Sequence, residues 1–595
     1  MPVKASSDFE ITTDYIIKYQ NNADYVTVNE SVTIDVNTSQ YYLPAGTVQE
    51  FEIPDFDPIQ REGEREFKLD SISITDGDGK KLAFQSKEQT TGINVTVKQP
   101  VNITPSEPYT MTLSYKTHEL FNKNGNIVNL YIPGLPKDTP FTHKDSKNNL
   151  ITTFKYNTSL QLIGDTPEVS YMQPAGIKAS TSGNTKVYTL TQQQRLGQSA
   201  WLQLGTKQYY YFKIVQNSPK TDNLTPEELS KVADYLSTNV FTLPLPRNYD
   251  ETKQNVLIKS ISPQPTSIES DTEGNLTALF EVPANRSTEI VIEGYLSLDN
   301  STTKEVPEID LDQYLKAVKS DQKLATYLKA DKYWESNNQA IISKSDEIIK
   351  DAATINDYIT AVYQSTIDTL EYDTSKVTGE NKRNGALAAL NGAPAVCMEY
   401  SDLAVALLRA QGVPARAAVG YGNDPTGVEN NISNEKASVQ QIGHQWVQVW
   451  IPDYGWYSID PTWGESGRTY LGTNLDHLLW YTLGSSEQES LGGTSLSSAD
   501  SVSKEDFEAY QVYIQALSQE QFDSLSQDTV GLSEYLADYS DSNYSPFTYF
   551  LKTTIVGRAL IVSLPIILLI IFFTTIATFI VRVKRGKLTR KETTS

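Results

Sequence analysis

Cysteine is almost absent from this chain, since Cys397 is the only one among 595 residues. A single cysteine excludes an intramolecular disulfide, so the fold must be stabilised by packing. A lone thiol in so long a chain is either an inert buried side chain or a nucleophile. Histidine is scarce too, with four residues, and no group of Cys and His has the spacing of metal ligands. We therefore expect neither a metal site nor an organic cofactor.

Positive charge is also in short supply. The chain has 50 Lys and Arg against 73 Asp and Glu, a formal net charge of -23. Binding to nucleic acid needs clustered Lys and Arg, so this composition argues against a nucleic-acid partner. Hydrophobic residues make up 39% of the chain, which is enough for packed cores. The length exceeds what one core supports and predicts about three or four domains.

The first thirty residues lack the apolar stretch of about 7–15 residues that a secretory signal requires. Near the other end, Ala559–Val581 is uncharged over 23 residues, long enough to cross a bilayer as a helix. The tail at 582–595 has six basic residues and one acidic residue, whereas Asp500–Phe550 has ten acidic residues and one basic residue. The positive-inside rule places the tail in the cytoplasm and the N-terminal region outside the cell. Because export needs a signal, we expect an incomplete or processed start; the alternative is a tail-anchored protein facing the cytoplasm.

Short alternating segments dominate the first half of the chain. YVTVNESVTIDV, INVTVKQ and TMTLSYK alternate apolar or β-branched residues with polar ones, and turn residues separate such segments. This pattern is typical of β-sandwiches. We expect three sandwich-like β-rich modules, at 8–119, 120–217 and 218–304, of the kind that act as spacers or docking surfaces.

The pattern then changes to helices followed by strands, which predicts an α+β domain at 305–485. One amphipathic helix is expected through a three–four spacing of apolar residues from Ile348 to Val362, and another after Cys397 in MEYSDLAVALLRAQ. ARAAVGYG, HQWVQVWI and GWYSID read as strands. The segment 486–558 predicts an acidic, Ser-rich stalk, with short helices at KEDFEAYQVYIQAL and EQFDSLSQ. A transmembrane helix at 559–581 and a basic cytoplasmic tail at 582–595 complete the chain.

Cys397 lies at the start of a predicted helix. Unsatisfied N–H groups and the helix dipole at such a position favour an anion, and so favour the nucleophilic thiolate. The competing interpretation is a small buried hydrophobe, which is the usual role of a cysteine outside a disulfide.

His444 begins a strand whose outward-facing set is His444, Trp446, Gln448 and Trp450. An imidazole near Cys397 could take the thiol proton and return it to a leaving amine. Asp460 ends the next strand and could orient the imidazole, or could simply cap a turn before Pro461. A hairpin at PDYG joins the two strands. An even-length loop would put His444 and Asp460 on opposite faces, so their pairing requires an odd loop or a bulge.

Together these segments resemble the transglutaminase-like superfamily, whose members share a papain-like core. The resemblance extends over about Leu311 to Gly484. Cys397 with EYSDLAVALLRAQGVPARAAVGYG matches the nucleophile helix and the following strand, His444 with QWVQVWI matches the H-x-W strand, and DPTW from Asp460 matches the D-P-T motif. The resemblance implies that His444 activates Cys397, which attacks an amide carbonyl to give a thioester, with the Cys397 N–H as an oxyanion donor. Water or an amine then resolves the thioester, and the motif does not choose between hydrolysis and cross-linking.

Other residues are expected to support this chemistry. Trp446, Trp463 and Tyr421 are candidate walls of a substrate groove, because aromatic rings offer large contact areas. The polar loop at 423–441 could form its rim. Arg416 is expected to brace the sheet, and His477 to be a structural hydrogen-bonding residue rather than a second base.

The first functional hypothesis is therefore an amide-processing enzyme displayed on a bacterial-type cell surface, with a protein, peptide or cell-wall peptide as substrate. The second is a non-catalytic adhesion or scaffold protein that uses the β-modules and the groove for binding. The complete set of Cys397, His444 and Asp460 favours the enzyme, because a pure binder has no need of all three. An intracellular tail-anchored protease is a third hypothesis.

Overall fold

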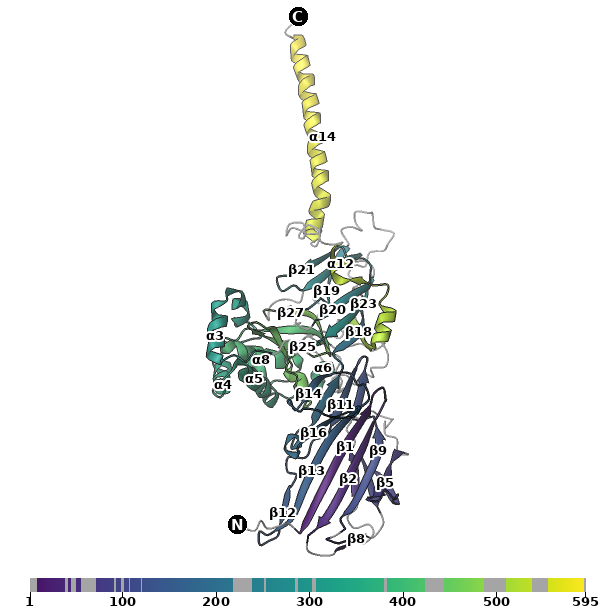
Figure 1. Cartoon of the computed structure of the whole chain (residues 1–595). Coiled ribbons are helices and arrows are strands. Elements are labelled where there is room, and N and C mark those ends of the chain that lie inside the picture. The colour runs from purple at the N-terminus through teal and green to yellow at the C-terminus, as the bar shows by residue number, and fades with distance from the viewer. Residues whose placement is uncertain are drawn as a thin grey trace.

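The structure is a computed structural model of the whole chain. It describes residues 8–37, 41–43, 50–54, 71–89, 92–97, 101–105, 107–118, 120–217, 238–250, 253–283, 287–301, 306–378, 382–422, 443–472, 474–485, 510–537 and 555–592. Several β-sheets come first, a mixed α/β region follows, and an apolar helix ends the described chain (Figure 1).

The N-terminal β region (8–204) contains one large sheet and one smaller sheet around a shared apolar core. The large sheet has the order β15-β16-β13-β1-β2-β9-β5, and β12 pairs with β13. Its strands are β1 Phe9–Gln20, β2 Val26–Val36, β5 Ser73–Asp76, β9 Tyr109–Thr117, β12 Thr142–Lys144, β13 Leu150–Ile163, β15 Ser180–Ser182 and β16 Thr185–Leu190. The smaller sheet, β10-β11-β17-β14, comprises β10 Phe121–Asn124, β11 Ile127–Ile132, β14 Val169–Gln173 and β17 Ala200–Leu204. A short helix, α1 Gln192–Arg195, precedes β17.

Two small sheets also occur in this region. β3 Tyr41–Leu43 pairs with β8 Val101–Ile103, and β7 Gly92–Val97 pairs with both β4 Glu50–Pro54 and β6 Phe84–Gln89.

The large sheet unites segments that the sequence led us to assign to two modules. β1 pairs in parallel with β13, so strands from 8–119 and from 120–217 lie side by side in one sheet. Alternation along a strand shows which side chains face a core, but it does not name the partner strand. The border expected near residue 119 is therefore not a border between sheets.

The central β region contains a five-stranded sheet, β28-β18-β23-β20-β29, and a three-stranded sheet, β19-β22-β21. The strands are β18 Lys207–Asn217, β19 Thr238–Leu245, β20 Asn255–Ser262, β21 Ser267–Ser270, β22 Leu276–Pro283, β23 Glu289–Asp299, β28 Tyr510–Leu517 and β29 Val530–Gly531. β18 pairs with β23, so this sheet starts within the range that we expected for the second module.

The strand β28 returns from beyond the α+β region to pair with β18. We expected this stretch to form a short helix in a stalk. Val512 and Ile514 are buried while Gln511 and Tyr513 are partly exposed, and this period of two suits a strand at the edge of a sheet. The next predicted helix is present as α11 Gln519–Leu525, and α12 Leu532–Ala537 follows β29. The other parts of the expected stalk, 486–509 and 538–554, lie outside the described residues.

The α+β region (306–485) packs helices against a four-stranded antiparallel sheet of order β26-β25-β24-β27. The helices are α3 Leu311–Ser320, the 3-10 helix η3 Gln322–Leu328, α4 Gln339–Ile349, α5 Ile355–Thr369, α6 Thr374–Thr378, α7 Ala386–Leu390, α8 Cys397–Ala410 and α9 Pro461–Gly464. The strands are β24 Ala415–Gly422, β25 Gly443–Ile451, β26 Gly455–Ile459 and β27 His477–Leu483.

The single amphipathic helix that we expected from Ile348 to Val362 is divided into α4 and α5. Thr354 caps α5 through its side chain, which accepts from the Asp357 N–H, and the Asp357 carboxylate accepts from the Thr354 N–H in return. This reciprocal pair satisfies N–H groups that a continuous helix would bond internally, and so it begins a new helix.

Side chains of both β regions contact the α+β region, and Gln173 and Glu273 are two of them. The Gln173 amide at the end of β14 donates to the Gly467 carbonyl over 2.8 Å and accepts from the Thr469 N–H over 2.7 Å. Arg416 on β24 forms an ion pair of 2.8 Å with Glu273 of the central β region and donates to Gln448. Arg416 thus braces the sheet, as the sequence predicted.

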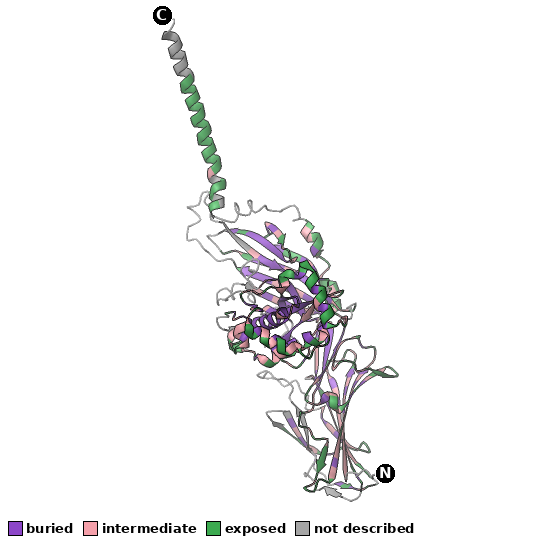
Figure 2. Cartoon of the chain, turned by 90° about the vertical axis from the view of Figure 1, so that its left-hand side faces the viewer, coloured by how far each residue is buried: buried purple, intermediate pink, exposed green. Residues whose placement is uncertain are grey.

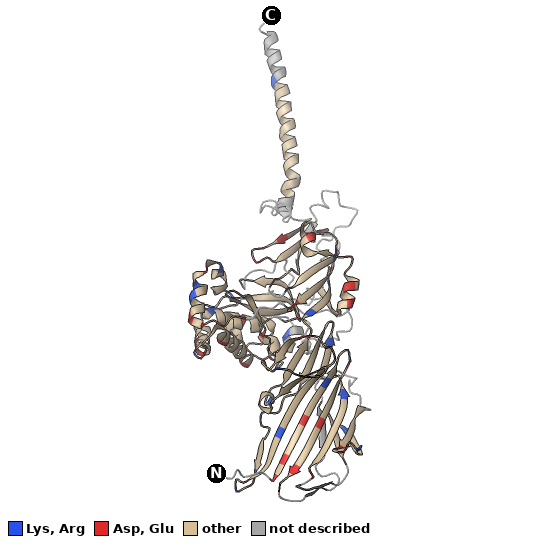
Figure 3. Cartoon of the chain, in the orientation of Figure 1, with Lys and Arg blue, Asp and Glu red and all other residues tan. Residues whose placement is uncertain are grey.

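The terminal helix α14 Ile555–Glu592 stands apart from the rest of the chain. Its segment Ala559–Arg582 is long and apolar enough to cross a membrane and is not buried against any other part of the structure. In Figure 2 most of this segment is green, which marks exposed residues, and in Figure 3 its middle carries no charge. Pro565 lies inside the helix.

Helix α8 is buried on all sides from Cys397 to Arg409. Asp402, one of its buried charged residues, accepts bonds of 2.9 and 2.5 Å from Arg383 and one of 2.7 Å from the Trp334 indole. Removing one partner of such a pair leaves the other charge buried and uncompensated.

We therefore expect Asp402→Ala to lower the free energy of unfolding by about 3–5 kcal/mol, because Arg383 loses its counter-ion. Chemical denaturation of the full chain in detergent, followed by tryptophan fluorescence, would measure this. The exposed Asp351 offers a matched control, and Asp351→Ala should change stability little. Equal effects of the two substitutions would contradict the structural importance of the Arg383 pair.

Candidate active site

Cys397 is the first residue of α8 and is only 7% exposed. The Glu399 carboxylate secures this end of the helix, since it accepts from the Val396 N–H over 3.0 Å and from the Asn384 N–H over 2.8 Å. Lys376 lies 2.6 Å from the same carboxylate and offsets its charge. The thiol therefore lies where the helix dipole favours an anion, as the sequence predicted.

The first turns of α8 are tied to the other two elements of the site. One turn beyond Cys397, the Ser401 hydroxyl donates to the Gln445 carbonyl over 3.0 Å, and Gln445 directly follows His444 on β25. The neighbouring Tyr400 hydroxyl donates to Glu465, at the end of α9, over 2.8 Å. A helical turn rises about 5.4 Å, so these bonds bring the start of α8 to the start of β25 and to α9.

The loop of the hairpin between β25 and β26 has an odd number of residues, which a pairing of His444 with Asp460 requires. Ile451 pairs with Gly455, so the loop comprises the three residues 452–454, with Asp453 at a φ of 63°. Continuing this register places Asp460 opposite Trp446, on the face of the sheet that also carries His444. The loop length thus determines that the two side chains meet.

The Asp460 carboxylate uses both of its oxygens. Oδ2 lies 2.8 Å from His444 Nε2, and Oδ1 accepts from the N–H groups of Thr462 and Trp463. Asp460 is therefore the N-cap of α9, with Pro461 in the first helical position, and at the same time the partner of His444. Burial alone raises the pKa of Asp460, but the charges and hydrogen bonds of His444 and His477 outweigh it and hold this pKa well below its ordinary value.

The two tryptophans that the sequence nominated flank the imidazole instead of lining an open groove. The rings of Trp463 and Trp446 lie within about 20° of parallel to the His444 ring, at centroid distances of 4.8 and 6.0 Å, and both are buried. Gly422 makes room for Trp463, because a Cβ on Gly422 would lie 2.2 Å from the indole. Indole faces stabilise a positively charged ring, so this packing suits a histidine that gains a proton during reaction.

Tyr421 lies away from this cluster. Along β24 its neighbour Gly420 pairs with His444, so the Tyr421 side chain points to the opposite face of the sheet. There it is buried against Trp480, at a centroid distance of 4.9 Å. The polar loop expected to form a rim, 423–441, lies outside the described residues.

The expectation that His444, Trp446 and Gln448 face outward was wrong. All three are buried. Tyr249 of the central β region packs with Trp446 and donates a hydrogen bond of 3.1 Å to Gln448, and the rings of Trp463 and His477 lie beside His444. Alternation along β25 correctly groups them on one face, but a covering residue that lies 199 positions away leaves no trace in the local pattern.

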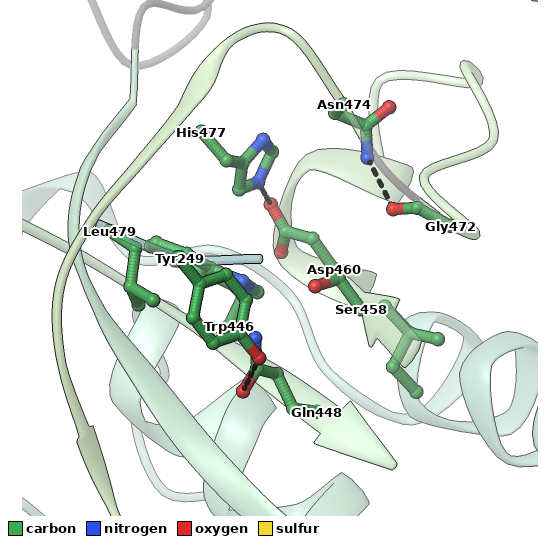
Figure 4. Close-up of a pocket in the computed structure, with 10 residues that line it drawn as sticks. Tyr249, Trp446, Gln448, Ser458, Asp460, Gly472, Asn474, His477 and Leu479 are labelled. Carbon is green, nitrogen blue, oxygen red and sulfur yellow. Dashed lines mark hydrogen bonds and ion pairs between the residues drawn. The ribbon is translucent and has the colours of Figure 1, made fainter. Parts of the chain in front are cut away.

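A small pocket adjoins Asp460 on this covered face. Its walls include Tyr249, Trp446, His477 and Leu479, and its volume of about 10 Å³ suits something the size of one water molecule (Figure 4). It is too small to hold a peptide side chain.

His477 lies closer to the proposed catalytic residues than the sequence predicted. Its Nε2 lies 3.1 Å from Asp460 Oδ2 (Figure 4), the oxygen that His444 also contacts. Its Nδ1 lies 2.8 Å from Asp476. The Asp-His pair in NLDHLLWY was the available signal, and we assigned it only a structural hydrogen bond. That role is present, but its partner is Asp460.

Donor atoms of His444, Asp460 and His477 come within 4.8 Å of one another, a spacing that can also hold a metal ion. Both imidazoles are already at hydrogen-bonding distance from one Asp460 oxygen. We therefore assign these three side chains to a hydrogen-bonded network.

Comparison with known proteins adds an independent line of evidence. The sequence profile of the transglutaminase-like superfamily matches residues 342–461. A protein-glutamine gamma-glutamyltransferase of Pseudomonas aeruginosa is 40% identical over 68 residues, which is 11% of this chain and 10% of that protein. The uncharacterised protein YebA of Bacillus subtilis is 35% identical over 72 residues, which is 11% of this chain and 9% of that protein. The matches thus span about a tenth of the length of these relatives.

Solved structures show weaker likeness. A protein from Cytophaga hutchinsonii, provisionally named a cysteine protease, is 13% identical and has a TM-score of 0.33 over 57% of this chain and 94% of that one. The periplasmic domain of TgpA from Pseudomonas aeruginosa is 16% identical and has a TM-score of 0.21 over 42% of this chain and 89% of that one. These scores are too low to support an argument about shared architecture.

The profile match includes Cys397 and His444 and reaches as far as Pro461, the same stretch in which α8, β25 and α9 converge. Residues 342–461 therefore carry a domain of the transglutaminase-like superfamily.

Proposed function

We propose that this chain is a membrane-anchored cysteine enzyme that acts on amide bonds outside the cytoplasm. Cys397 is the nucleophile, His444 the general base and acid, and Asp460 the group that orients His444. The observation that carries the proposal is the buried 2.8 Å contact of His444 with Asp460, on a strand whose start is bonded to the first turns of the Cys397 helix. A purely binding surface gains nothing from burying such a pair.

The proposed reaction proceeds in two steps. The Cys397 thiol gives its proton to His444, and the sulfur attacks the amide carbonyl carbon to form a tetrahedral intermediate. Collapse of the intermediate breaks the C–N bond, His444 returns the proton to the departing amine, and a thioester remains. His444 then deprotonates either water, which yields a carboxylic acid, or an amine, which yields a new amide.

Asp460 supports both steps while it remains ionised. Its contact with Nε2 leaves Nδ1 of His444 to exchange the proton, and its negative charge stabilises the imidazolium that forms. Because its pKa is held well below the ordinary value, Asp460 stays a carboxylate at neutral pH.

A protein or peptide is the expected substrate, by analogy with the name of the Pseudomonas aeruginosa relative, which refers to glutamine side chains in proteins. The α14 segment is the proposed anchor, with the basic tail in the cytoplasm and the large N-terminal part outside.

Alkylation of the single thiol tests the Cys397–His444 pair. In full-length protein in detergent, we expect iodoacetamide to label Cys397 rapidly at pH 6–7, well below the ordinary thiol pKa of about 8.5. His444→Ala should slow labelling at least tenfold, and intact mass gives the rate directly. His143→Ala, at an exposed site on β12, is the control. An inert Cys397, or labelling that does not depend on His444, would refute the pair and favour the binding-scaffold hypothesis.

Replacing Asp460 tests its orienting role. Asp460→Asn removes the charge that stabilises the His444 imidazolium, so we expect turnover to fall on the order of 10³-fold or more. With a glutamine-containing peptide and a labelled primary amine, label incorporation reports amide transfer and conversion of glutamine to glutamate reports hydrolysis, while ammonia release reports the thioester-forming step that both reactions share. Cys397→Ala provides the inactive control. Full activity of Asp460→Asn would contradict the assignment.

The proposed topology can be tested with engineered cysteines. In a Cys397→Ala background, Ser595→Cys in the tail should react with a membrane-impermeant maleimide only after the cells are permeabilised. Ser182→Cys on the exposed strand β15 should react with intact cells once any outer barrier is removed. The reverse pattern would instead support the cytoplasm-facing alternative.

A further inference from the structure

His477 contacts two carboxylates at once. Its Nε2 lies 3.1 Å from Asp460 Oδ2, and its Nδ1 lies 2.8 Å from Asp476 Oδ1. Only 7% of its side chain is exposed, and both acids are buried. Figure 4 shows its ring directed at the Asp460 carboxylate from the side of β27.

The proton count at His477 follows from this geometry. An ionised carboxylate can only accept hydrogen bonds, so a ring nitrogen that contacts one must carry a proton. With a carboxylate at each nitrogen, both nitrogens must be protonated and the ring is an imidazolium. Burial lowers the pKa of His477, but the bonds and charges of Asp460 and Asp476 outweigh it and raise this pKa above its ordinary value.

The surrounding charges are balanced. Arg468 lies 3.3 Å from the second oxygen of Asp476 and forms an ion pair with it. Asp460 and Asp476 thus face Arg468 and His477, two negative charges against two positive ones. Among the described residues, the rings of His444, Trp446, Trp463 and Tyr470 lie beside the His477 ring, and Tyr249 lines the same small pocket.

We propose that His477 is a positioning residue of the Cys397–His444–Asp460 centre: a permanent imidazolium that shares one Asp460 oxygen with His444 and lowers the pH range in which the thiol is active. The inference rests on the proposed function. In a simple triad the carboxylate interacts with one imidazole, whereas here the same Asp460 oxygen interacts with two, His444 and the positively charged His477.

The direction of the effect follows from the sign of the charge. The two imidazole centroids are 5.6 Å apart, so a positive His477 disfavours a second positive charge on His444 and favours a negative charge on Cys397. Both effects lower the apparent pKa values of the Cys397–His444 pair. Removing the charge must therefore move the pH profile upward, whether the resting pair is neutral or a thiolate with an imidazolium.

The test compares the pH dependence of Cys397 alkylation in full-length wild-type protein and in His477→Gln, which keeps a polar side chain but loses the charge. We expect the midpoint of the profile to rise by about one pH unit, so that labelling at low pH slows about tenfold while the alkaline plateau is unchanged. His477→Lys retains a cation and should keep the wild-type midpoint. His143→Gln, the same substitution at an exposed site, should leave the profile in place.

A purely structural role for His477 would lower labelling at every pH without moving the midpoint, and that result would overturn the proposal. His477→Asn provides a second neutral variant if His477→Gln does not fold, and thermal denaturation identifies the folded variants.

The protonation state can be measured without any reaction. Long-range proton–nitrogen NMR of ¹⁵N-histidine protein resolves four imidazoles, and the signal missing from His477→Gln belongs to His477. We expect both of its nitrogens to be protonated at pH 8, where an ordinary imidazole of pKa about 6.5 is neutral. A neutral His477 would overturn the proposal. A charged His477 beside an unreactive wild-type Cys397 would instead reject the proposed function and leave the charge assignment intact.

Discussion

The carboxylate of Asp460 joins three parts of the α+β region at one buried point. Its Oδ1 caps the short helix α9, and its Oδ2 lies at hydrogen-bonding distance from the imidazoles of His444 on β25 and His477 on β27. Burying an unpaired carboxylate is strongly unfavourable, so each of these partners helps to stabilise Asp460 at this position. The positions of the end of β26, the start of β25 and the start of β27 therefore depend on one another through this single group.

Helix α8 imposes the second constraint. A helix buried on every face must satisfy each charge that it carries inside the protein. Arg383 pairs with Asp402, Lys376 pairs with Glu399, and Arg409 donates to backbone carbonyls. These pairs fix the axial position of the helix, and the Ser401 bond to β25 fixes its register against the sheet. Cys397 thus occupies a defined place at the N-terminus of α8.

The β regions contribute to the site although they supply none of the three proposed catalytic residues. Tyr249 closes the face of β25 that bears His444, and the Arg416–Glu273 ion pair joins the same sheet to the central β region. Gln173 of the N-terminal β region holds the backbone at Gly467 and Thr469, on either side of Arg468, which in turn contacts Asp476. A path of direct contacts thus connects β14 to the carboxylates around His477, so the β regions do more than act as spacers.

Local sequence determined a good deal of this protein. The helix after Cys397, the strands on both sides of the PDYG turn, the apolar helix near the C-terminus and the bracing role of Arg416 all follow from short-range patterns of polarity and turn residues. The three proposed catalytic residues were also marked by adjacent motifs. What only the tertiary structure decided were the pairings between distant segments: the parallel match of β1 with β13, the return of β28 to β18, the covering of Trp446 and Gln448 by Tyr249, and the convergence of His444 and His477 on one Asp460 oxygen. The physical reason is that a strand's alternation records which side chains are buried, whereas the identity of the partner depends on packing between residues that are far apart in the chain.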